Sequence, residues 1–240
     1  MILTAHQPTY LPWLGLFHKV AIADRFISFD QVQYLPKDWN SRNRIKTATG
    51  PTWLTVPVHR RDHRTKALAE IEIDNSVPWA RKHLRSLEMN YTKSPHFHRY
   101  VEFFRDVYSR RWDHLVELND HMLAYFLDVL GISTPVESAA SHEFVGHKSD
   151  LVLDMCRQLG ASAYIFGELG RDYADVAQFR AAGVVPYFQQ YKHPVYPQRH
   201  GEFVSHLSVV DLLANCGEDS LETLMSGNLT RAELERAVAR

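Results

Sequence analysis

The sequence predicts an α/β protein in which about five parallel strands form one sheet between two layers of helices, a three-layer Rossmann-like domain with a helical insertion. Short apolar runs alternate with segments of helical periodicity, which is the pattern of βαβ units. Helical segments without intervening strands interrupt this alternation at about residues 76–131. With 240 residues, of which 45% are hydrophobic, the chain can bury a core of this size.

The first βαβ unit is predicted within the first thirty residues. An apolar strand at residues 2–6 leads into a turn bounded by Pro8 and Pro12, and a helix follows at about residues 13–24. Pro12 suits the start of a helix, because the first amide of a helix has no internal partner to lose. A second apolar strand is predicted at residues 26–29.

The segment after this unit is predicted as a polar loop that leads to strands at residues 53–58 and 69–73. Three helices then form the insertion. Ser76 and Ser94 are suited to begin the first two, and the third ends at Gly131 after spanning about residues 113–130.

The alternation of strands and helices resumes after the insertion, and residues 1–240 are interpreted as a single domain. Three more strands complete the predicted sheet, at residues 134–137, 163–166 and 184–188. Helices are predicted at residues 149–159 and 173–182, from about Ser208, and in a short tail at residues 221–240.

Composition excludes several classes of protein. The net charge of −1 is unlike the basic excess of nucleic-acid-binding domains, and no apolar run reaches the roughly 18 residues of a membrane span. The first residues lack the basic and apolar regions of a signal peptide, and Cys156 and Cys216 lack a CxxC spacing, as expected of reduced thiols. We therefore expect a cytoplasmic protein without a nucleic-acid or membrane partner.

The charges are distributed unevenly along the chain. Residues 1–120 carry 18 Lys and Arg against 13 Asp and Glu, whereas residues 121–240 carry 9 against 15. The positive excess therefore accompanies the N-terminal motifs described below, which favours a small anionic or sugar-linked substrate.

The first turn holds the strongest candidate site. His6, Gln7, Thr9 and Tyr10 follow the first strand, and Trp13 opens the helix. In open α/β sheets ligands bind at the carboxyl ends of strands, beside helix N-termini. A structural hydrogen bond for His6 and a core position for Tyr10 are the alternative interpretation.

Two further motifs are expected near the same edge. Asp30 and Gln33 follow the second strand. Arg42, Arg44 and Lys46 alternate, so in an extended segment they would face one way and attract phosphate or carboxylate, with Asn40 and Asn43 as neutral donors. A solvated run of charges is the alternative.

Later loops could reach the same edge. Gly167, Gly170 and Tyr173 lie between a strand and a helix, where glycines can cradle a phosphate or merely tighten a turn. Lys192, His193 and Tyr196 follow the last strand, and Ser205 and Ser208 precede a helix. Ser208 is suited either to cap that helix or to bind phosphate.

A metal site is less well supported. His114, Glu117 and His121 share one helical face, but that face lies about a quarter-turn from the apolar stripe, whereas ligands inside a bundle point inward. No Cys or His set has zinc-finger spacing, and the P-loop, GxSxG and GxGxxG motifs are absent from the sequence. No metal ligands are therefore predicted among the histidines.

At these motifs the chain resembles the WbqC-like family. The resemblance covers nearly the whole chain, with one departure at Glu168 and Leu169, where a smaller polar residue is more usual. It is carried by HQPTYLPWLGLFHK (6–19), ADRFISFDQVQY (23–34), WNSRNRIKT (39–47), WLTVPV (53–58), YIFGELGRDY (164–173), HPVYPQ (193–198) and GEFVSHLSVVDLLANCG (201–217). The resemblance implies a role in O-antigen, polysaccharide or secondary-metabolite biosynthesis.

The start of the chain is also similar to pantothenate synthetase and related nucleotidylyltransferases, whose HxGH motif binds ATP phosphates. Here Gly15 and His18 stand near that position at a different spacing. The helix after Ser208 stands where those enzymes have a phosphate-binding helix. This similarity implies ATP or another nucleotide with Mg²⁺ as cofactor.

Together these observations predict an enzyme, a nucleotide-dependent transferase or ligase that activates a carboxylate or phosphate for a sugar or amine. His6 is the candidate acid/base group, and Asp30 would hold Mg²⁺ or orient His6. The alternatives are a metal-dependent hydrolase or lyase, and a non-catalytic partner in a glycan-assembly complex. The last predicts that Tyr10, Trp13 and Trp39 form an exposed apolar patch.

Overall fold

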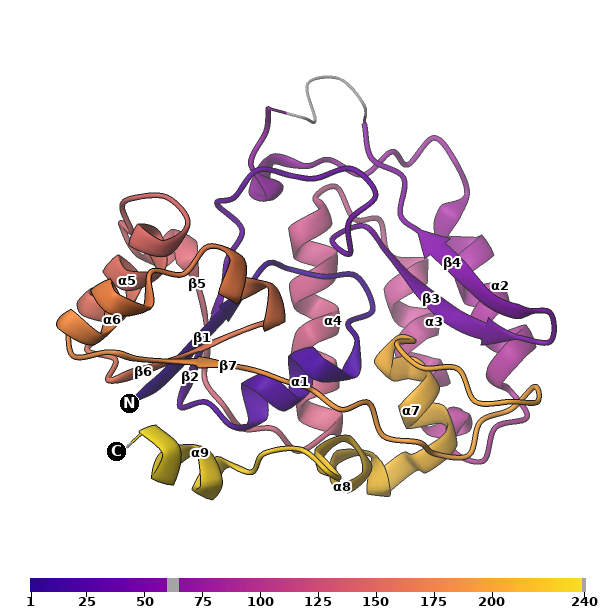
Figure 1. Cartoon of the computed structure of the whole chain (residues 1–240). Helices are drawn as coiled ribbons and strands as arrows, with labels where there is room; N and C mark the ends of the chain where they lie inside the picture. Colours follow the sequence, from indigo (N-terminus) through magenta and orange to yellow (C-terminus); the bar gives the residue numbers. More distant parts are fainter. Residues whose placement is uncertain (60–64, 239–240) are drawn as a thin grey trace.

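A five-stranded parallel sheet forms the centre of the protein in the computed structural model, which describes residues 1–59 and 65–238 (Figure 1). The strand order is β5-β2-β1-β6-β7. The strands are β1 (Ile2–His6), β2 (Arg25–Ser28), β5 (Val136–Ser138), β6 (Ala163–Phe166) and β7 (Val185–Phe188). The predicted fold class and all five predicted strands are confirmed, with shifts of one or two residues at their ends.

The order in which strands are added to the sheet reverses beside β1. It first moves from β1 outward to β2 and then β5, and afterwards returns to the other side of β1 to add β6 and β7. All neighbours in this sheet are parallel, so their carboxyl ends share one edge. The gap between β1 and β6 at that edge is where doubly wound sheets bind ligands.

Helices cover both faces of the sheet, as the three-layer prediction requires (Figure 1). One face buries Leu3, Ile27 and Tyr164 beneath α5 (Ser149–Gln158) and α6 (Val176–Ala181). The other face packs against α1 (Leu14–Ala21), α4 (Leu115–Val129) and α9 (Arg231–Val238); Phe26, for example, belongs to the same core as Phe17 and Phe126.

An antiparallel hairpin of β3 (Arg42–Thr47) and β4 (Gly50–Thr55) stands beside the sheet. Gly50 adopts a φ of +107°, which the tight turn between the strands requires and a side chain would oppose. The prediction of a strand at 53–58 is correct only in part, and that at 69–73 is wrong. A 3-10 helix at Leu68–Glu70 replaces the start of the second strand, and its end forms only two isolated bridges, Glu72 to His114 and Ile73 to Val58.

Three helices form the predicted insertion: α2 (Trp79–Tyr91), α3 (Val101–Ser109) and α4. The buried face of α2 carries Trp79, His83, Leu87 and Tyr91, while Ala80 and Leu84 lie at the margin of the core. The long α4 carries its apolar stripe into the core shared by α1 and the sheet, where Phe126 packs edge-on against Phe17 of α1.

The C-terminal segment closes the fold through α7 (Val209–Cys216), α8 (Ser220–Met225) and α9. Leu234 of α9 packs under Ile2 and Ile165, which brings the two chain ends side by side (Figure 1). Arg231 pairs with Asp24, and the last two residues of the predicted tail lie outside the described residues.

Cys156 and Cys216 are free thiols. In residues 1–59 and 65–238 no helix is long and apolar enough to cross a membrane.

Candidate functional site

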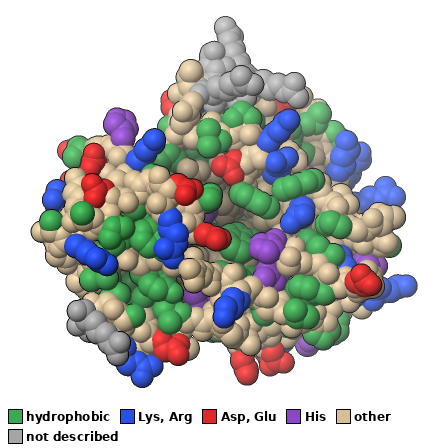
Figure 2. All heavy atoms as spheres, in the orientation of Figure 1, with side chains coloured by type: hydrophobic (Ala, Val, Ile, Leu, Met, Phe, Trp, Pro, Cys, Tyr) green, Lys and Arg blue, Asp and Glu red, His purple; other side chains and the backbone are tan. Residues whose placement is uncertain are grey.

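The turn after β1 is held against the start of β3 at the carboxyl edge of the sheet. The Asn40 side-chain amide donates to the Pro8 carbonyl (2.9 Å) and to Gln7 Oε1 (3.1 Å), and Asn43 Nδ2 donates to the Leu11 carbonyl (2.6 Å). Two motifs that the sequence places over 30 residues apart therefore meet. Figure 2 shows this face hollowed near the position that the β1–α1 turn and α4 occupy in Figure 1.

Backbone hydrogen bonds add the C-terminal segment to the same assembly. The Ser208 amide donates to the Arg44 carbonyl (2.9 Å), and the Val209 amide donates to the Pro12 carbonyl (2.8 Å). Three segments that the sequence presents as separate motifs thus form one continuous wall.

His6 is a neutral imidazole at the end of β1. Its Nδ1 lies 2.8 Å from the Gln7 carbonyl, which can only accept, so Nδ1 carries the proton and Nε2 is left as an acceptor. Burial, helped by the positive charge of Lys19, lowers the pKa of His6 to about 4. Near neutral pH the imidazole of His6 is therefore unprotonated at Nε2, which can accept a proton.

Lys19 is a buried amine that sequence reasoning missed. Its side chain is 3% exposed, Nζ donates to the Ala5 carbonyl (2.9 Å), and no carboxylate among the described residues lies within ion-pair distance. Burial lowers the pKa of Lys19 from 10.5 to about 7. A lysine within the apolar stripe of a short helix is the signal that could have revealed it.

We expect Lys19→Met to stabilise the protein near neutral pH. Between pH 7 and 10.5 the unfolded chain binds more protons at this position than the folded chain, so native stability rises with pH. Each tenfold loss of proton affinity corresponds to about 1.4 kcal/mol. Because the pKa of Lys19 falls from 10.5 to about 7, the free-energy cost of burying its charge exceeds the roughly 1.5–3 kcal/mol that one hydrogen bond to a charged group contributes. Thermal unfolding at pH 6 should show a higher Tm for Lys19→Met than for wild type, and the difference should shrink towards pH 10. The exposed Lys82→Met is the control, and a lower Tm of Lys19→Met at pH 6 would contradict this account.

Two carboxyl groups interact with each other near the end of β2, the strand whose Ser28 is paired with His6. Asp30 is 7% exposed, its Oδ1 has no hydrogen-bond partner, and burial raises its pKa. Asp120 on α4 accepts the Ser28 hydroxyl hydrogen (2.9 Å). Burial, with a contribution from the charge of Asp30, raises the pKa of Asp120 to about 6.

Sequence reasoning also missed Asp120, because the periodicity of α4 indicates a core helix with a polar flank. The neighbouring Asn119 interrupts the apolar stripe, which is the available signal. Asn119 is buried, and its side-chain amide donates to the Asn40 carbonyl (2.9 Å), so α4 is tied directly to the site.

Arg42 and Arg44 extend from β3 over the indole of Trp53. Their Cζ atoms lie 4.2 and 5.6 Å from the ring centroid. The expected alternation of Arg42, Arg44 and Lys46 on a strand is present, but Lys46 is buried. Its Nζ donates to Gln198 Oε1 (3.1 Å) and to the carbonyls of residues 201 and 202.

Histidines of the C-terminal loop lie opposite these arginines. The His206 ring stacks on Trp13 with centroids 5.8 Å apart, and the His193 ring lies 5.2 Å from His206. His206 Nδ1 lies 2.8 Å from Ser205 Oγ. The Trp13 indole covers Gly15, where an added Cβ would come within 2.2 Å of it, so glycine is needed for this close approach.

Several predicted site residues have structural partners instead. The Tyr10 hydroxyl, fully buried, is hydrogen-bonded to His83 Nδ1 (2.7 Å) and to Tyr108. His18 Nδ1 accepts from Gln189, and its Nε2 donates to the Leu229 carbonyl. Because Tyr10 is buried, it forms no exposed apolar patch with Trp13 and Trp39.

Ser208 and Tyr196 also serve the interior. Ser208 is fully buried and its Oγ caps α7 by accepting from the Val210 amide (3.3 Å). Tyr196 donates its hydroxyl hydrogen to Asp211 (3.0 Å), which also accepts from Tyr91 and Gln198 (2.9 and 2.7 Å).

The remaining candidates lie around the margin of the site. Gly167 begins a 3-10 helix at Glu168–Asp172, and Gly170 packs so tightly against Phe166 that a Cβ would clash at 2.6 Å. Thr9 is buried with a hydroxyl that has no partner. Three candidates are exposed: Gln33, Tyr173 and Lys192. Gln33 forms a β-bridge with Ala67, and the backbone of Lys192 is hydrogen-bonded to the Asn228 side chain.

The structure does not assemble a metal-binding cluster from the histidines that it describes: no group of three or more His, Cys, Asp or Glu side chains there is placed to hold an ion. His121 instead stacks against Phe103 and Trp112.

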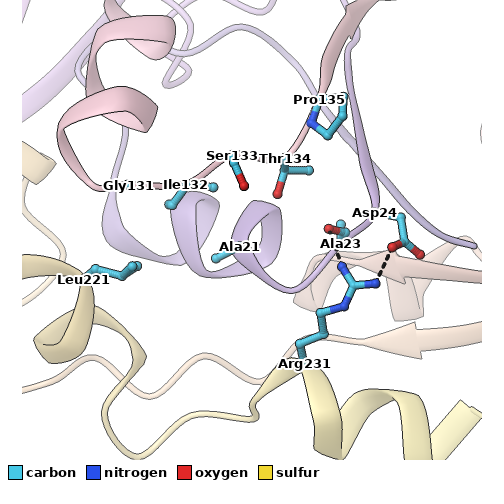
Figure 3. A pocket seen from close by; sticks show the side chains of 10 residues that line it. All are labelled: Ala21, Ala23, Asp24, Gly131, Ile132, Ser133, Thr134, Pro135, Leu221 and Arg231. Atoms are coloured by element: carbon cyan, nitrogen blue, oxygen red, sulfur yellow. Dashed lines mark hydrogen bonds and ion pairs between the residues drawn. The ribbon is translucent and has the colours of Figure 1, made fainter.

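A separate cavity of about 370 Å³ lies at the opposite, amino edge of the sheet (Figure 3). Its charged lining residues, Asp24 and Arg231, are already paired with each other. It therefore offers no free charged group for chemistry.

The fold and the site define an α/β protein with a buried polar centre at the carboxyl edge of a doubly wound sheet. The profile of the WbqC-like protein family matches residues 7–223, and the chain belongs to this family. It is 34% identical over 220 residues to the uncharacterized protein Rv1507c of Mycobacterium tuberculosis, covering 91% of this chain and 95% of that protein. No solved structure matches it significantly.

Proposed function

We propose that the protein is a cytoplasmic enzyme of sugar, O-antigen or secondary-metabolite biosynthesis, a nucleotide-dependent transferase or ligase. It would activate a carboxylate or phosphate and transfer it to a sugar or amine. The observation that supports the proposal is the pair of interacting carboxyls, the buried Asp30 and the half-buried Asp120, at the edge where such sheets bind ligands and where β1 ends at His6.

The carboxyl pair fits Mg²⁺. The buried Asp30 Oδ1 has no partner, and no lysine or arginine in the described ranges lies within ion-pair distance of Asp30 or Asp120. Mg²⁺ prefers oxygen ligands and is commonly held by one or two carboxylates together with substrate phosphates. Asp30 and Asp120 would hold the ion, which when bound would neutralise phosphate charge.

His6 would take the proton from the attacking group of the acceptor. Its neutral form with Nε2 free is the form that a general base requires, and it persists well below neutral pH because the pKa is about 4. The Gln7 carbonyl fixes the ring orientation through Nδ1. Burial, with a smaller contribution from the charge of Lys19, keeps the ring unprotonated by lowering the pKa of His6.

Calorimetric titration with Mg·ATP, Mg·UTP and Mg·CTP tests this proposal. We expect saturable micromolar binding of at least one nucleotide, weakened tenfold or more in Asp30→Asn. Asp128→Asn, an exposed position on the same helix as Asp120, is the matched control and should bind as wild type. Asp30→Asn should remain folded, because it removes a buried charge and no hydrogen bond of Oδ1. Absence of binding by all three nucleotides would refute the proposal.

A further inference from the structure

Trp53 holds two arginines in place on the β3–β4 hairpin. Arg44 lies directly opposite Trp53 in the ladder, and Arg42, two residues earlier on β3, faces the same side. With Cζ atoms 4.2 and 5.6 Å from the centroid, both guanidinium groups lie against the indole. Such cation–π contacts, each about 0.5–1 kcal/mol at exposed sites, restrict the side chains before any ligand arrives.

These two arginines have no counter-charge. In the described part of the chain neither pairs with a carboxylate, and the Nε atom of each is buried without a hydrogen-bond partner. Arg44 Nη2 reaches only the His206 carbonyl, at 3.3 Å. Two adjacent unpaired guanidinium groups repel each other and present several N–H donors, an arrangement that a phosphate, with oxygens for both, would satisfy.

The surroundings suit a ligand with a ring next to its charged group. Trp39 and Trp53 remain 39% and 42% exposed, with ring centroids 5.4 Å apart. Figure 2 shows basic side chains among hydrophobic ones beside the hollow, over the start of β3. Across from them His193 Nε2 is buried without a partner, and His206 adopts a left-handed φ of +58°, a conformation that costs a non-glycine residue energy.

The hairpin lies next to the His6 turn but is distinct from the carboxyl pair. The Tyr10 amide donates to the Trp39 carbonyl (3.1 Å), and Asn40 contacts Gln7 and Pro8. Asp120 lies on α4 and contacts β2 through Ser28, whereas the hairpin segment contacts the turn that follows His6.

We propose that Arg42 and Arg44, held by Trp53, bind the phosphate of the acceptor substrate, and that this acceptor is a sugar phosphate whose ring packs on Trp39. The assignment of this phosphate to the acceptor rests on the proposed function. The phosphate-binding subsite itself rests only on the hairpin geometry.

Titration with glucose 1-phosphate, inorganic phosphate and glucose, followed by calorimetry and tryptophan fluorescence, tests this inference without nucleotide present. We expect glucose 1-phosphate to bind more tightly than inorganic phosphate and glucose not to bind. Arg42→Gln and Arg44→Gln should each weaken binding tenfold or more. Arg44→Lys, which keeps the charge but loses the planar fork, should fall between. Arg180→Gln, exposed on α6, is the matched control.

The outcomes separate the two proposals. Sugar phosphate binding that depends on Arg42 and Arg44 in a protein that binds no nucleotide would support the subsite and refute the nucleotide-dependent function. Nucleotide binding without binding of glucose 1-phosphate or inorganic phosphate would refute the subsite. If Arg42→Gln loses Mg·ATP binding and the wild-type protein does not bind glucose 1-phosphate, the arginines bind the nucleotide and the acceptor assignment is refuted.

Discussion

His6→Ala is expected to reduce turnover by roughly 10²–10⁴-fold, the usual contribution of a positioned general base, while nucleotide affinity stays close to that of wild type. The imidazole makes one local hydrogen bond, to the carbonyl of the next residue, so its removal should lower the Tm by only a few degrees. The measurement is release of phosphate or pyrophosphate from the nucleotide that binds, with a sugar phosphate as acceptor.

The pH profile distinguishes a base from a purely structural residue. Since the pKa of His6 is about 4, the wild-type rate should lose the contribution of this base only as the pH falls towards 4. His6→Ala should lack that limb. His200→Ala, a histidine whose ring lies beside the Asn90 carbonyl rather than at the site, is the control. An unchanged rate in His6→Ala would exclude it from the chemistry.

Asp211→Ala is expected to be the most destabilising of these substitutions. The carboxylate accepts hydrogen bonds from Tyr91, Tyr196 and Gln198, and its charge acts on the buried Lys46. Removing it leaves the buried hydroxyls of Tyr91 and Tyr196 and an Nε2 hydrogen of Gln198 without their acceptor. Each buried donor left unpaired costs about 1–3 kcal/mol, so we expect a total loss of about 3–5 kcal/mol. For a domain of this size that corresponds to a Tm lower by roughly 6–20 °C.

A second variant separates hydrogen bonding from charge. Asp211→Asn retains an acceptor oxygen and should lose less stability than Asp211→Ala, whereas Asp219→Ala at an exposed position should change the Tm little. Thermal unfolding followed by circular dichroism is the measurement. A Tm of Asp211→Ala within about two degrees of wild type would show that the network contributes little.

The fold could be predicted from local signals because each strand of the parallel sheet is a short apolar run bounded by turns or helices. The hairpin could not, since Arg42–Thr47 is polar and its strand character depends on pairing with β4. The same tertiary pairing converts Arg42 and Arg44 from an ambiguous run of charges into neighbours on one indole.

Site residues could be predicted from the sequence only where a polar side chain lies at or just after the end of a strand. His6 and Asp30 meet that condition, and the structure brings their segments together. Lys19 and Asp120 lie within helices, where periodicity favours assignment to a core or a solvated face, so only the packing of α1 and α4 on the sheet reveals them. The polar groups of Tyr10, His18, Tyr196 and Ser208 do make specific hydrogen bonds, but their partners are interior residues.

The carboxyls of Asp30 and Asp120 belong to different layers of the protein, because Asp30 follows a strand while Asp120 stands on a helix of the insertion. Their separation consequently depends on how those layers are stacked. A small slide of the helix along the sheet would alter the repulsion between the carboxyls and their affinity for protons or cations. The insertion therefore sets this spacing from a distance, through contacts such as that between Phe126 and Phe17. Substitutions in that remote apolar contact should tune the chemistry without touching the substrate.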